Sequence, residues 1–130
     1  MKVLDSDMLI AILKGDEKAI DKLEEMKEKG ERITTTVLNE QEILFGAMLS
    51  KDKNYYNVCA DMMSCFDKLS YNQNCVPNVV KVIYQLEKTG RRVGLIDEII
   101  AGICLTNNAT LVTRNTNHFS RIPVIKLDSW

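Results

Sequence analysis

Four polar side chains stand where apolar segments of this chain are expected to begin or end, and together they could hold a metal ion. They are Asp5 in K-V-L-D, Glu42 in N-E-Q-E-I-L-F-G-A, Asp97 in G-L-I-D-E-I-I-A and Asn115 in L-V-T-R-N. Core segments rarely contain carboxylates without a reason. Carboxylates that meet in one place repel one another, and a hard cation such as Mg²⁺ or Mn²⁺ relieves that repulsion. We therefore expect metal-dependent phosphoryl transfer or phosphodiester cleavage.

Alternating strands and helices are expected to position these side chains. The sequence predicts strands at 2–5, 32–36, 93–96, 110–113 and 124–127, and helices at 7–14, 16–30, 39–50, 54–69, 77–88 and 97–106. This alternation is typical of a three-layer α/β/α sandwich with a mainly parallel sheet. Sites in such sheets lie beyond the carboxyl ends of the strands. Asp5, Asp97 and residues 113–115 all follow predicted strands, so they are expected at that edge.

The chain shows no linker, repeat or low-complexity tract, and residues 1–130 are expected to form a single domain. The helices at 54–69 and 77–88 are expected to form a helical hairpin. Their apolar stripes favour packing in the core, with a protein interface as the alternative.

Composition excludes several classes of function. With 17 basic and 18 acidic residues, the net charge of −1 argues against a general nucleic-acid binder but leaves room for a local basic rim. No apolar run is long enough to span a membrane and no signal peptide is recognisable, so a soluble cytoplasmic protein is expected. One histidine and four cysteines without a C-x-x-C pair make a zinc site improbable. Cys59 and Cys104 are expected to be buried, reduced thiols.

Each candidate carboxylate also has an ordinary structural interpretation. Asp5 alone could cap the helix that follows it, and Asp97 could be a charge that suits a helix N-terminus. Glu40 competes with Glu42, since it lies two residues away and points to a different side of the helix. Glu42 shares a helical face with Gly46, where another chain or a substrate could approach closely. The joint occurrence of these residues at one expected edge favours the functional interpretation.

Uncharged donors follow the fourth predicted strand. The hydroxyl of Thr113 and the amide of Asn115 could hold a metal-bound water or a phosphate oxygen without adding charge. We take Thr113, Arg114 and Ser6 as candidate substrate contacts.

Basic residues follow the same strand. Arg114, His118 and Arg121 could receive a phosphate backbone. His118 is a lone histidine in a loop, which is more often structural than catalytic, so we do not assign it the role of general base.

Four stretches of this chain resemble the PIN-domain nucleases, and specifically the VapC-type toxin ribonucleases of toxin–antitoxin pairs. They occur in the order and at the spacing of that family and span nearly the whole chain. The terminal D-S-W also resembles the ending of members of that family. The stretches are V-L-D-S-D-M-L-I at 3–10, E-I-L-F-G-A at 42–47, G-L-I-D-E-I-I-A-G-I at 94–103 and L-V-T-R-N-T-N-H-F-S-R-I at 111–122.

The resemblance implies a PIN-like fold with Asp5, Glu42, Asp97 and Asn115 around one or two Mg²⁺ or Mn²⁺ ions. It implies hydrolysis of single-stranded or loop RNA that leaves a 5′-phosphate and a 3′-hydroxyl. Asn115 stands where many PIN nucleases have Asp, and this departure argues against a second metal ion. The resemblance further implies a homodimer bound by a small antitoxin, with the apolar faces at 54–69 and 7–14 as candidate contacts.

Three other interpretations fit parts of the sequence. A receiver domain would explain Thr113 and Lys126, but no Asp follows the strand at 32–36. A haloacid-dehalogenase phosphatase would explain D-S-D at 5–7, but Leu9 stands where Thr or Val is expected. A PIN fold kept only for binding is the third alternative, and the three carboxylates argue against it.

Overall fold

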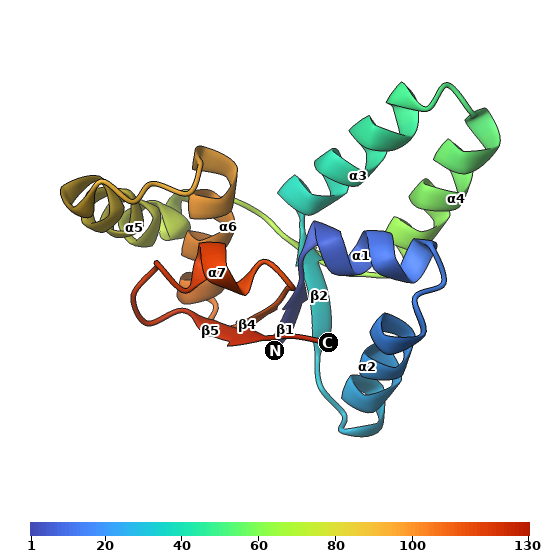
Figure 1. The fold of residues 1–130 in the computed structure, drawn as a ribbon, viewed down its shortest axis with the longest axis horizontal. Coiled ribbons are helices and arrows are strands. Elements are labelled where there is room, and N and C mark those ends of the chain that lie inside the picture. Colours follow the sequence, from blue (N-terminus) through green and yellow to red (C-terminus); the bar gives the residue numbers. More distant parts are fainter.

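Five parallel strands form one sheet at the centre of the computed structural model, which describes all residues from 1 to 130 (Figure 1). The strand order is β3-β2-β1-β4-β5, so the first strand of the chain lies in the middle. Lys2 of the central strand is level with Ile33 on one side and with Thr110 on the other. The strands are β1 (Lys2–Leu4), β2 (Ile33–Thr36), β3 (Asp67–Leu69), β4 (Thr110–Val112) and β5 (Lys126–Asp128).

Seven helices connect and cover these strands. A short 3₁₀ turn at Gln73–Cys75 leads into one of them. The helices are α1 (Ser6–Leu13), α2 (Glu17–Glu28), α3 (Val37–Leu49), α4 (Lys53–Ser64), α5 (Val76–Thr89), α6 (Leu95–Thr106) and α7 (Thr116–Phe119).

The sheet separates two hydrophobic cores, because successive residues of a strand point to opposite faces. Val3 of β1 and Leu111 of β4 belong to the core under α5, α6 and α7. Leu4 and Val112, their neighbours along the chain, belong to the core under α1, α2, α3 and α4. All four side chains are fully buried. The predicted three-layer α/β/α sandwich with a parallel sheet is confirmed.

The strand predicted at 93–96 is wrong. Gly94 adopts a positive φ of 113° and directly precedes α6, which begins at Leu95. The backbone N–H of Val93 donates to a carboxylate oxygen of Glu98 at 3.3 Å instead of pairing with a strand. Asp97 therefore reaches the sheet edge from the first turn of a helix, and not from the end of a strand.

The helix predicted at 54–69 is too long, and the helical hairpin is also wrong. Helix α4 ends at Ser64, and residues 67–69 form β3, an edge strand that pairs with β2. Strand β3 lies between α4 and α5 in the chain, and the two helices cover opposite faces of the sheet. Helix α4 therefore packs on α3 while α5 packs on α6 (Figure 1). The antiparallel pair in this fold is α3 and α4.

Helices α5 and α6 approach each other closely at Gly102. A Cβ atom at this position would lie 2.2 Å from Cγ2 of Val79 and 3.0 Å from its backbone N and Cα. Only glycine allows this separation. The contact fixes the position of α6, which carries Asp97.

The cysteines match the prediction where one was made. Cys59 and Cys104 are buried, and all four cysteines are free thiols. Burial raises the pKa of the Cys104 thiol to about 12, with a smaller contribution from the charge of Asp5. No helix has both the length and the apolar composition that crossing a bilayer requires.

Candidate active site

Asp5 lies at the carboxyl end of the central strand and caps α1. Its Oδ1 accepts hydrogen bonds from the backbone N–H of Ser6 at 2.8 Å and from the side-chain amide of Asn39 at 3.0 Å. Its Oδ2 accepts from the hydroxyl of Thr113 at 2.8 Å. The side chain is only 8% exposed, so β1, α1, α3 and the end of β4 together fix one carboxylate.

The environment of Asp5 disfavours its charge. Burial raises the pKa of Asp5 to about 6, and the charges of Asp7 and Asp97 act in the same direction. Hydrogen bonds from Thr113 and Ser6 lower the pKa but do not compensate. A carboxylate held among other carboxylates in this way is characteristic of a functional site.

Glu42 joins the site from α3. The hydroxyl of Ser6 donates to Oε2 of Glu42 at 2.8 Å and accepts from the amide of Asn39 at 2.9 Å. Glu40 points elsewhere and forms an ion pair of 3.3 Å with Lys68 of β3. Of the two competing glutamates, Glu42 is the one that lies beside Asp5.

Asp97 and Asn115 meet through a histidine. Nδ1 of His118 lies 2.9 Å from Oδ2 of Asp97 and 3.1 Å from the amide nitrogen of Asn115. This nitrogen can donate to Asp97 when it carries a proton, or accept from Asn115 when it does not. Burial raises the pKa of Asp97, and the hydrogen bond from His118 opposes that rise. The histidine expected in a loop lies in α7, and the structural role expected for it stays a prediction.

These contacts form one continuous polar network that connects all four predicted residues, although Nδ1 of His118 can form a hydrogen bond with only one of its two partners at a time. The remaining link of this network is the backbone N–H of Asn115, which donates to the hydroxyl of Thr113 at 3.0 Å. An open cleft of about 350 Å³ adjoins this network between α3 and α6. The lining of this cleft consists of Leu38, Gln41, Glu42, Phe45, Ile96 and Asp97.

Two members of the network were not predicted as site residues. Asn39 stands near the start of α3, where an amide is also a common helix cap, but Thr36 is the cap and the buried Asn39 ties Asp5 and Ser6 to α3. No sequence signal separates this role from capping. Asp7 accepts from Thr113 at 3.1 Å and from the backbone N–H of Arg114 at 2.8 Å. The D-S-D motif could have indicated Asp7, because it places a second carboxylate two residues after Asp5.

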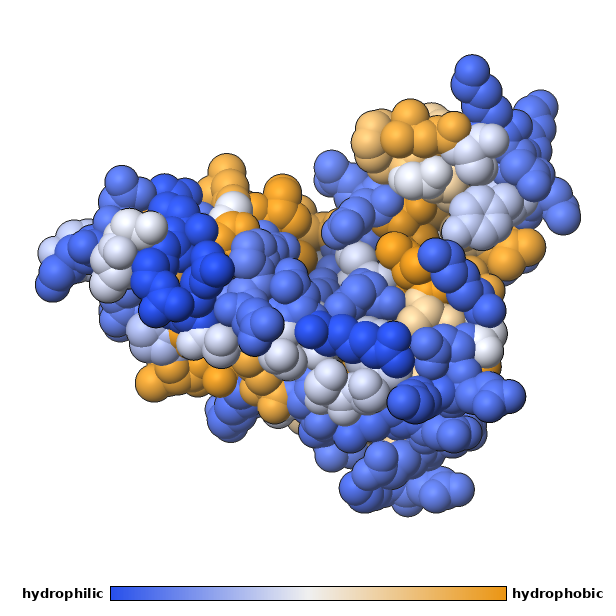
Figure 2. Space-filling view, viewed as in Figure 1, coloured by the Kyte–Doolittle hydropathy of each residue, from blue (hydrophilic) through white to orange (hydrophobic).

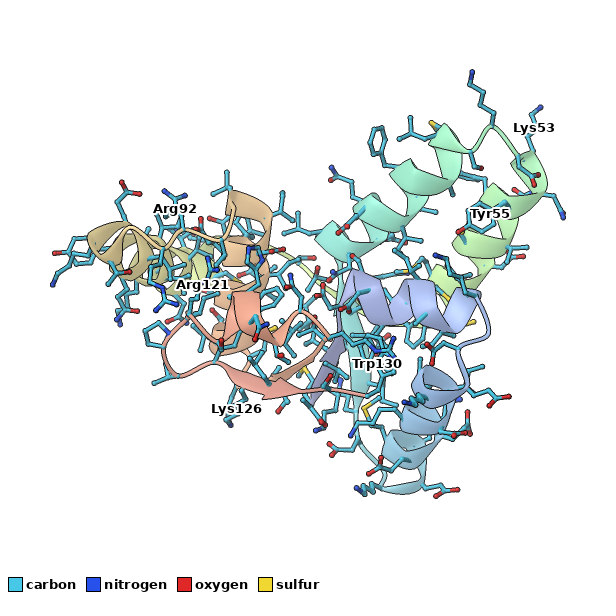
Figure 3. The ribbon with its side chains drawn as sticks, in the orientation of Figure 1. Lys53, Tyr55, Arg92, Arg121, Lys126 and Trp130 are labelled. Atoms are coloured by element: carbon cyan, nitrogen blue, oxygen red, sulfur yellow. The ribbon has the colours of Figure 1, made fainter.

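Arg114 is held beside the site from three directions. Its backbone N–H donates to Asp7, and its guanidinium forms an ion pair of 3.3 Å with Asp16. The guanidinium carbon lies 4.5 Å from the ring centre of Trp130, which Figure 3 labels below α1. Such stacking restrains an arginine while leaving its donors available.

The oxygen atoms of this site are suited to binding a hard cation. They are carboxylate, hydroxyl and amide oxygens, the ligands that Mg²⁺ and Mn²⁺ prefer. Oδ1 of Asp7 is buried and accepts no hydrogen bond, and the charges around Asp5 are not neutralised by any lysine or arginine in contact with it. No group of three or more His, Cys, Asp or Glu side chains is arranged so that it could hold a metal ion by itself. A magnesium ion does not require one, because it usually keeps several waters and takes one or two carboxylates.

Comparison with known proteins identifies the family. The sequence model of the PIN domain matches residues 2–125. The chain belongs to the PIN-domain family. The resemblance to PIN-domain nucleases inferred from the sequence is confirmed, and the receiver and phosphatase alternatives are wrong.

Relatives of this PIN-domain chain are similar over nearly their whole length. Ribonuclease VapC2 of Rickettsia felis is 28% identical over 98% of this chain and 96% of its own. The tRNA(fMet)-specific endonuclease VapC of Shigella flexneri is 24% identical over the same shares of the two chains. The crystal structure of VapBC2 from Rickettsia felis, bound to a DNA fragment from its promoter, contains a chain with a TM-score of 0.90 and 27% identity. The similarity covers 99% of this chain and 98% of that chain.

Proposed function

We propose that this protein is a metal-dependent endoribonuclease that hydrolyses phosphodiester bonds of RNA and is the toxin of a toxin–antitoxin pair. The observation that carries the proposal is the hydrogen-bonded network that brings Asp5, Glu42, Asp97 and Asn115 to one sheet edge. The whole-length similarity to VapC ribonucleases supports the same activity.

Asp5, Glu42 and Asp97 would hold Mg²⁺ or Mn²⁺. A bound ion of this kind lowers the pKa of a water and stabilises the charge that develops on a phosphate. Asp5 is the most firmly fixed of the three, because three hydrogen bonds determine its orientation. Asp97 is held by His118, so its carboxylate is already aligned before an ion binds.

The uncharged and basic residues would act on the substrate. Asn115, at the N-terminus of α7, presents an amide that can donate to a phosphate oxygen when Nδ1 of His118 carries a proton and donates to Asp97. The hydroxyls of Ser6 and Thr113 are engaged with carboxylates, so we assign them to orienting the metal ligands more than to contacting RNA. Arg114 has a fixed guanidinium at the rim, which suits a phosphate of the substrate backbone.

Protein partners would bind at exposed apolar side chains. The apolar side chains Ile10, Ile12 and Leu13 are only partly buried, and the contact expected at 7–14 stays a prediction. Tyr55 and Val58 of α4 are partly exposed, as expected for the face at 54–69. The most exposed group lies on α3, where Phe45, Met48 and Leu49 are each more than 60% exposed. A homodimer and a small antitoxin would cover these faces, and Figure 2 shows apolar residues exposed at the tip of the α3–α4 pair.

The deciding experiment is cleavage of a mixed pool of structured and single-stranded RNA with Mn²⁺ or Mg²⁺. It compares the wild-type chain with Asp97→Asn, and EDTA serves as the metal-free control. We expect metal-dependent cleavage that falls to background in Asp97→Asn, with an unchanged circular dichroism spectrum. Equal cleavage by the two proteins would remove Asp97 from the site. Binding of Mn²⁺ without any RNA cleavage would instead identify a binding-only PIN domain.

A further inference from the structure

A second polar cleft lies away from the carboxylates, where the end of α5 meets the segment after α7. Its volume is about 300 Å³, and no hydrophobic or acidic side chain lines it. The lining consists of Gln85, Lys88, Thr89, Arg91, Arg121 and Pro123. Three cations thus share one small concave surface on a chain whose net charge is −1.

The three cations of this cleft have no acidic partner. Lys88, Arg91 and Arg121 form no ion pair and donate no side-chain hydrogen bond, although the ammonium of Lys88 lies over the ring of Tyr84 at 5.8 Å. The nearby Arg92 differs, since its guanidinium binds Glu87 and the buried Glu98. The position of Lys88 in the last turn of a helix has a general electrostatic explanation. The same explanation covers Arg91, which directly follows the cap of α5, but it does not extend to Arg121 from the segment after α7.

Both walls of the cleft are anchored in the same hydrophobic core. The backbone N–H of Arg91 donates to the carbonyl of Leu86 at 2.9 Å, just after Gly90 reverses the chain. On the other wall, the N–H of Ile122 donates to the carbonyl of Phe119 at 2.9 Å. Leu86, Phe119 and Ile122 are buried in one core cluster. The spacing of the cations is therefore set by the fold.

Helix α7 and the residues after it connect the cleft to the candidate active site. His118, which holds Asp97, and Arg121 are three residues apart, and the N–H of Arg121 approaches the carbonyl of His118 at 3.4 Å. Figure 3 labels Arg121 beside α7, and Figure 2 shows strongly hydrophilic residues gathered over this part of the molecule. When one segment of a polymer is bound at the carboxylates, a neighbouring segment of the same polymer could reach the cleft.

From this geometry we infer that the cleft of Lys88, Arg91 and Arg121 binds backbone phosphates of single-stranded RNA beside the cleaved bond. This inference rests on the proposed ribonuclease function. Two guanidiniums, one ammonium and the free amide of Gln85 are donors suited to phosphate oxygens. The absence of apolar lining disfavours a folded protein partner. Contacts of this kind position a nucleic acid without reading its sequence.

The test measures the affinity of a fluorescent, unstructured oligoribonucleotide in EDTA, which prevents cleavage, over a range of salt concentrations. The variants are Arg91→Ala/Arg121→Ala, Arg121→Lys and, as the matched control, Lys18→Ala, an exposed cation on α2 that forms no ion pair. Loss of two phosphate contacts should weaken binding about tenfold and reduce the salt slope by about 1.4. Arg121→Lys should keep most of the slope, and Lys18→Ala should match the wild-type chain.

Two results would overturn the inference. If the double variant binds RNA with wild-type affinity and slope while the wild-type chain cleaves RNA, the cleft is wrong and the proposed function stands. If the double variant loses binding of a polyglutamate peptide but not of RNA, the cleft is a protein contact. A wild-type chain that neither binds nor cleaves RNA would contradict the proposed function itself.

Discussion

At the scale of single residues, the site depends on carboxylates that the fold holds close together despite their mutual repulsion. Asp5 has three hydrogen-bond donors and still has a raised pKa, because burial and two neighbouring aspartates outweigh them. Such an arrangement costs stability in the absence of a cation. The cost is measurable at one position.

Replacing Asp5 by Asn should change how stability depends on pH. A group whose folded pKa is raised contributes stability below its ordinary pKa, and this contribution is lost as the pH rises through the folded value. For Asp5 the loss falls between about pH 4 and pH 6. As the pH rises through this window, the free energy of unfolding of Asp5→Asn should therefore increase relative to that of the wild-type chain by up to about 3 kcal/mol.

Urea unfolding in EDTA at several pH values measures this difference. The amide keeps the shape of the side chain and can still cap α1, and it replaces the oxygen that accepts from Thr113 by a donor at every pH, so the pH-dependent part of the difference reports the charge. A constant difference between the two proteins from pH 4 to pH 7 would show that Asp5 has an ordinary pKa.

The two glutamates of α3 give a second test at this scale. Glu42→Gln should lower kcat at least about tenfold, because it removes a charged ligand that Ser6 orients. Glu40→Gln only breaks the surface pair with Lys68, which is worth about 1 kcal/mol or less. Steady-state RNA cleavage by both variants measures the ranking. The reverse ranking would place the other face of α3 in the active site.

At the scale of elements, the contact of α5 with α6 determines where Asp97 lies. Gly102→Ala would place a methyl group against the backbone of Val79, and overpacking of this kind costs about 1–3 kcal/mol. We also expect weaker cleavage, because a shift of α6 moves Asp97 away from Asp5.

Gly46→Ala is the matched control for this prediction. Gly46 also lies inside a helix, but no atom would lie within 4 Å of its added Cβ. It should be neutral or about 0.5–1 kcal/mol more stable. Denaturant unfolding of both variants measures the difference, and similar losses in the two proteins would show that the α5–α6 contact adjusts at little cost.

Elements with a strong periodic pattern could be predicted from the sequence, and those defined by distant partners could not. Strand β1 and its Asp5 were placed correctly, as were the helices that carry Glu42 and the buried face of α6. Residues 67–69 continue the apolar spacing of α4, so only their pairing with β2 reveals β3. The segment at 93–96 is apolar and short like a strand, but Gly94 and the buried Glu98 make it the start of α6.

The sequence predicted that the candidate residues would lie near one sheet edge, but the contacts that connect them could not be predicted. Asn39 and Asp7 complete the network through contacts with residues far away in the chain, and local spacing carries no information about such contacts. The ion pair between Arg92 and the fully buried Glu98 is a similar case.

At the scale of the whole molecule, binding of a divalent ion should stabilise the fold. A ligand that binds only the folded state raises the free energy of unfolding by about 2.7 kcal/mol when its concentration is a hundred times Kd. Mn²⁺ should therefore raise the thermal unfolding midpoint of the wild-type chain by several degrees and leave that of Asp97→Asn nearly unchanged. Differential scanning calorimetry with and without EDTA measures both. Equal shifts in the two proteins would indicate that the ion binds elsewhere.

The central position of β1 also has a consequence for synthesis of the chain. Asp5 is made among the first residues, but the hydroxyl that orients it comes from Thr113, 108 residues later. Until β4 has left the ribosome, β1 lacks one of its two neighbouring strands and the carboxylates have no common edge. A nascent chain therefore lacks the assembled candidate site while most of it is being translated.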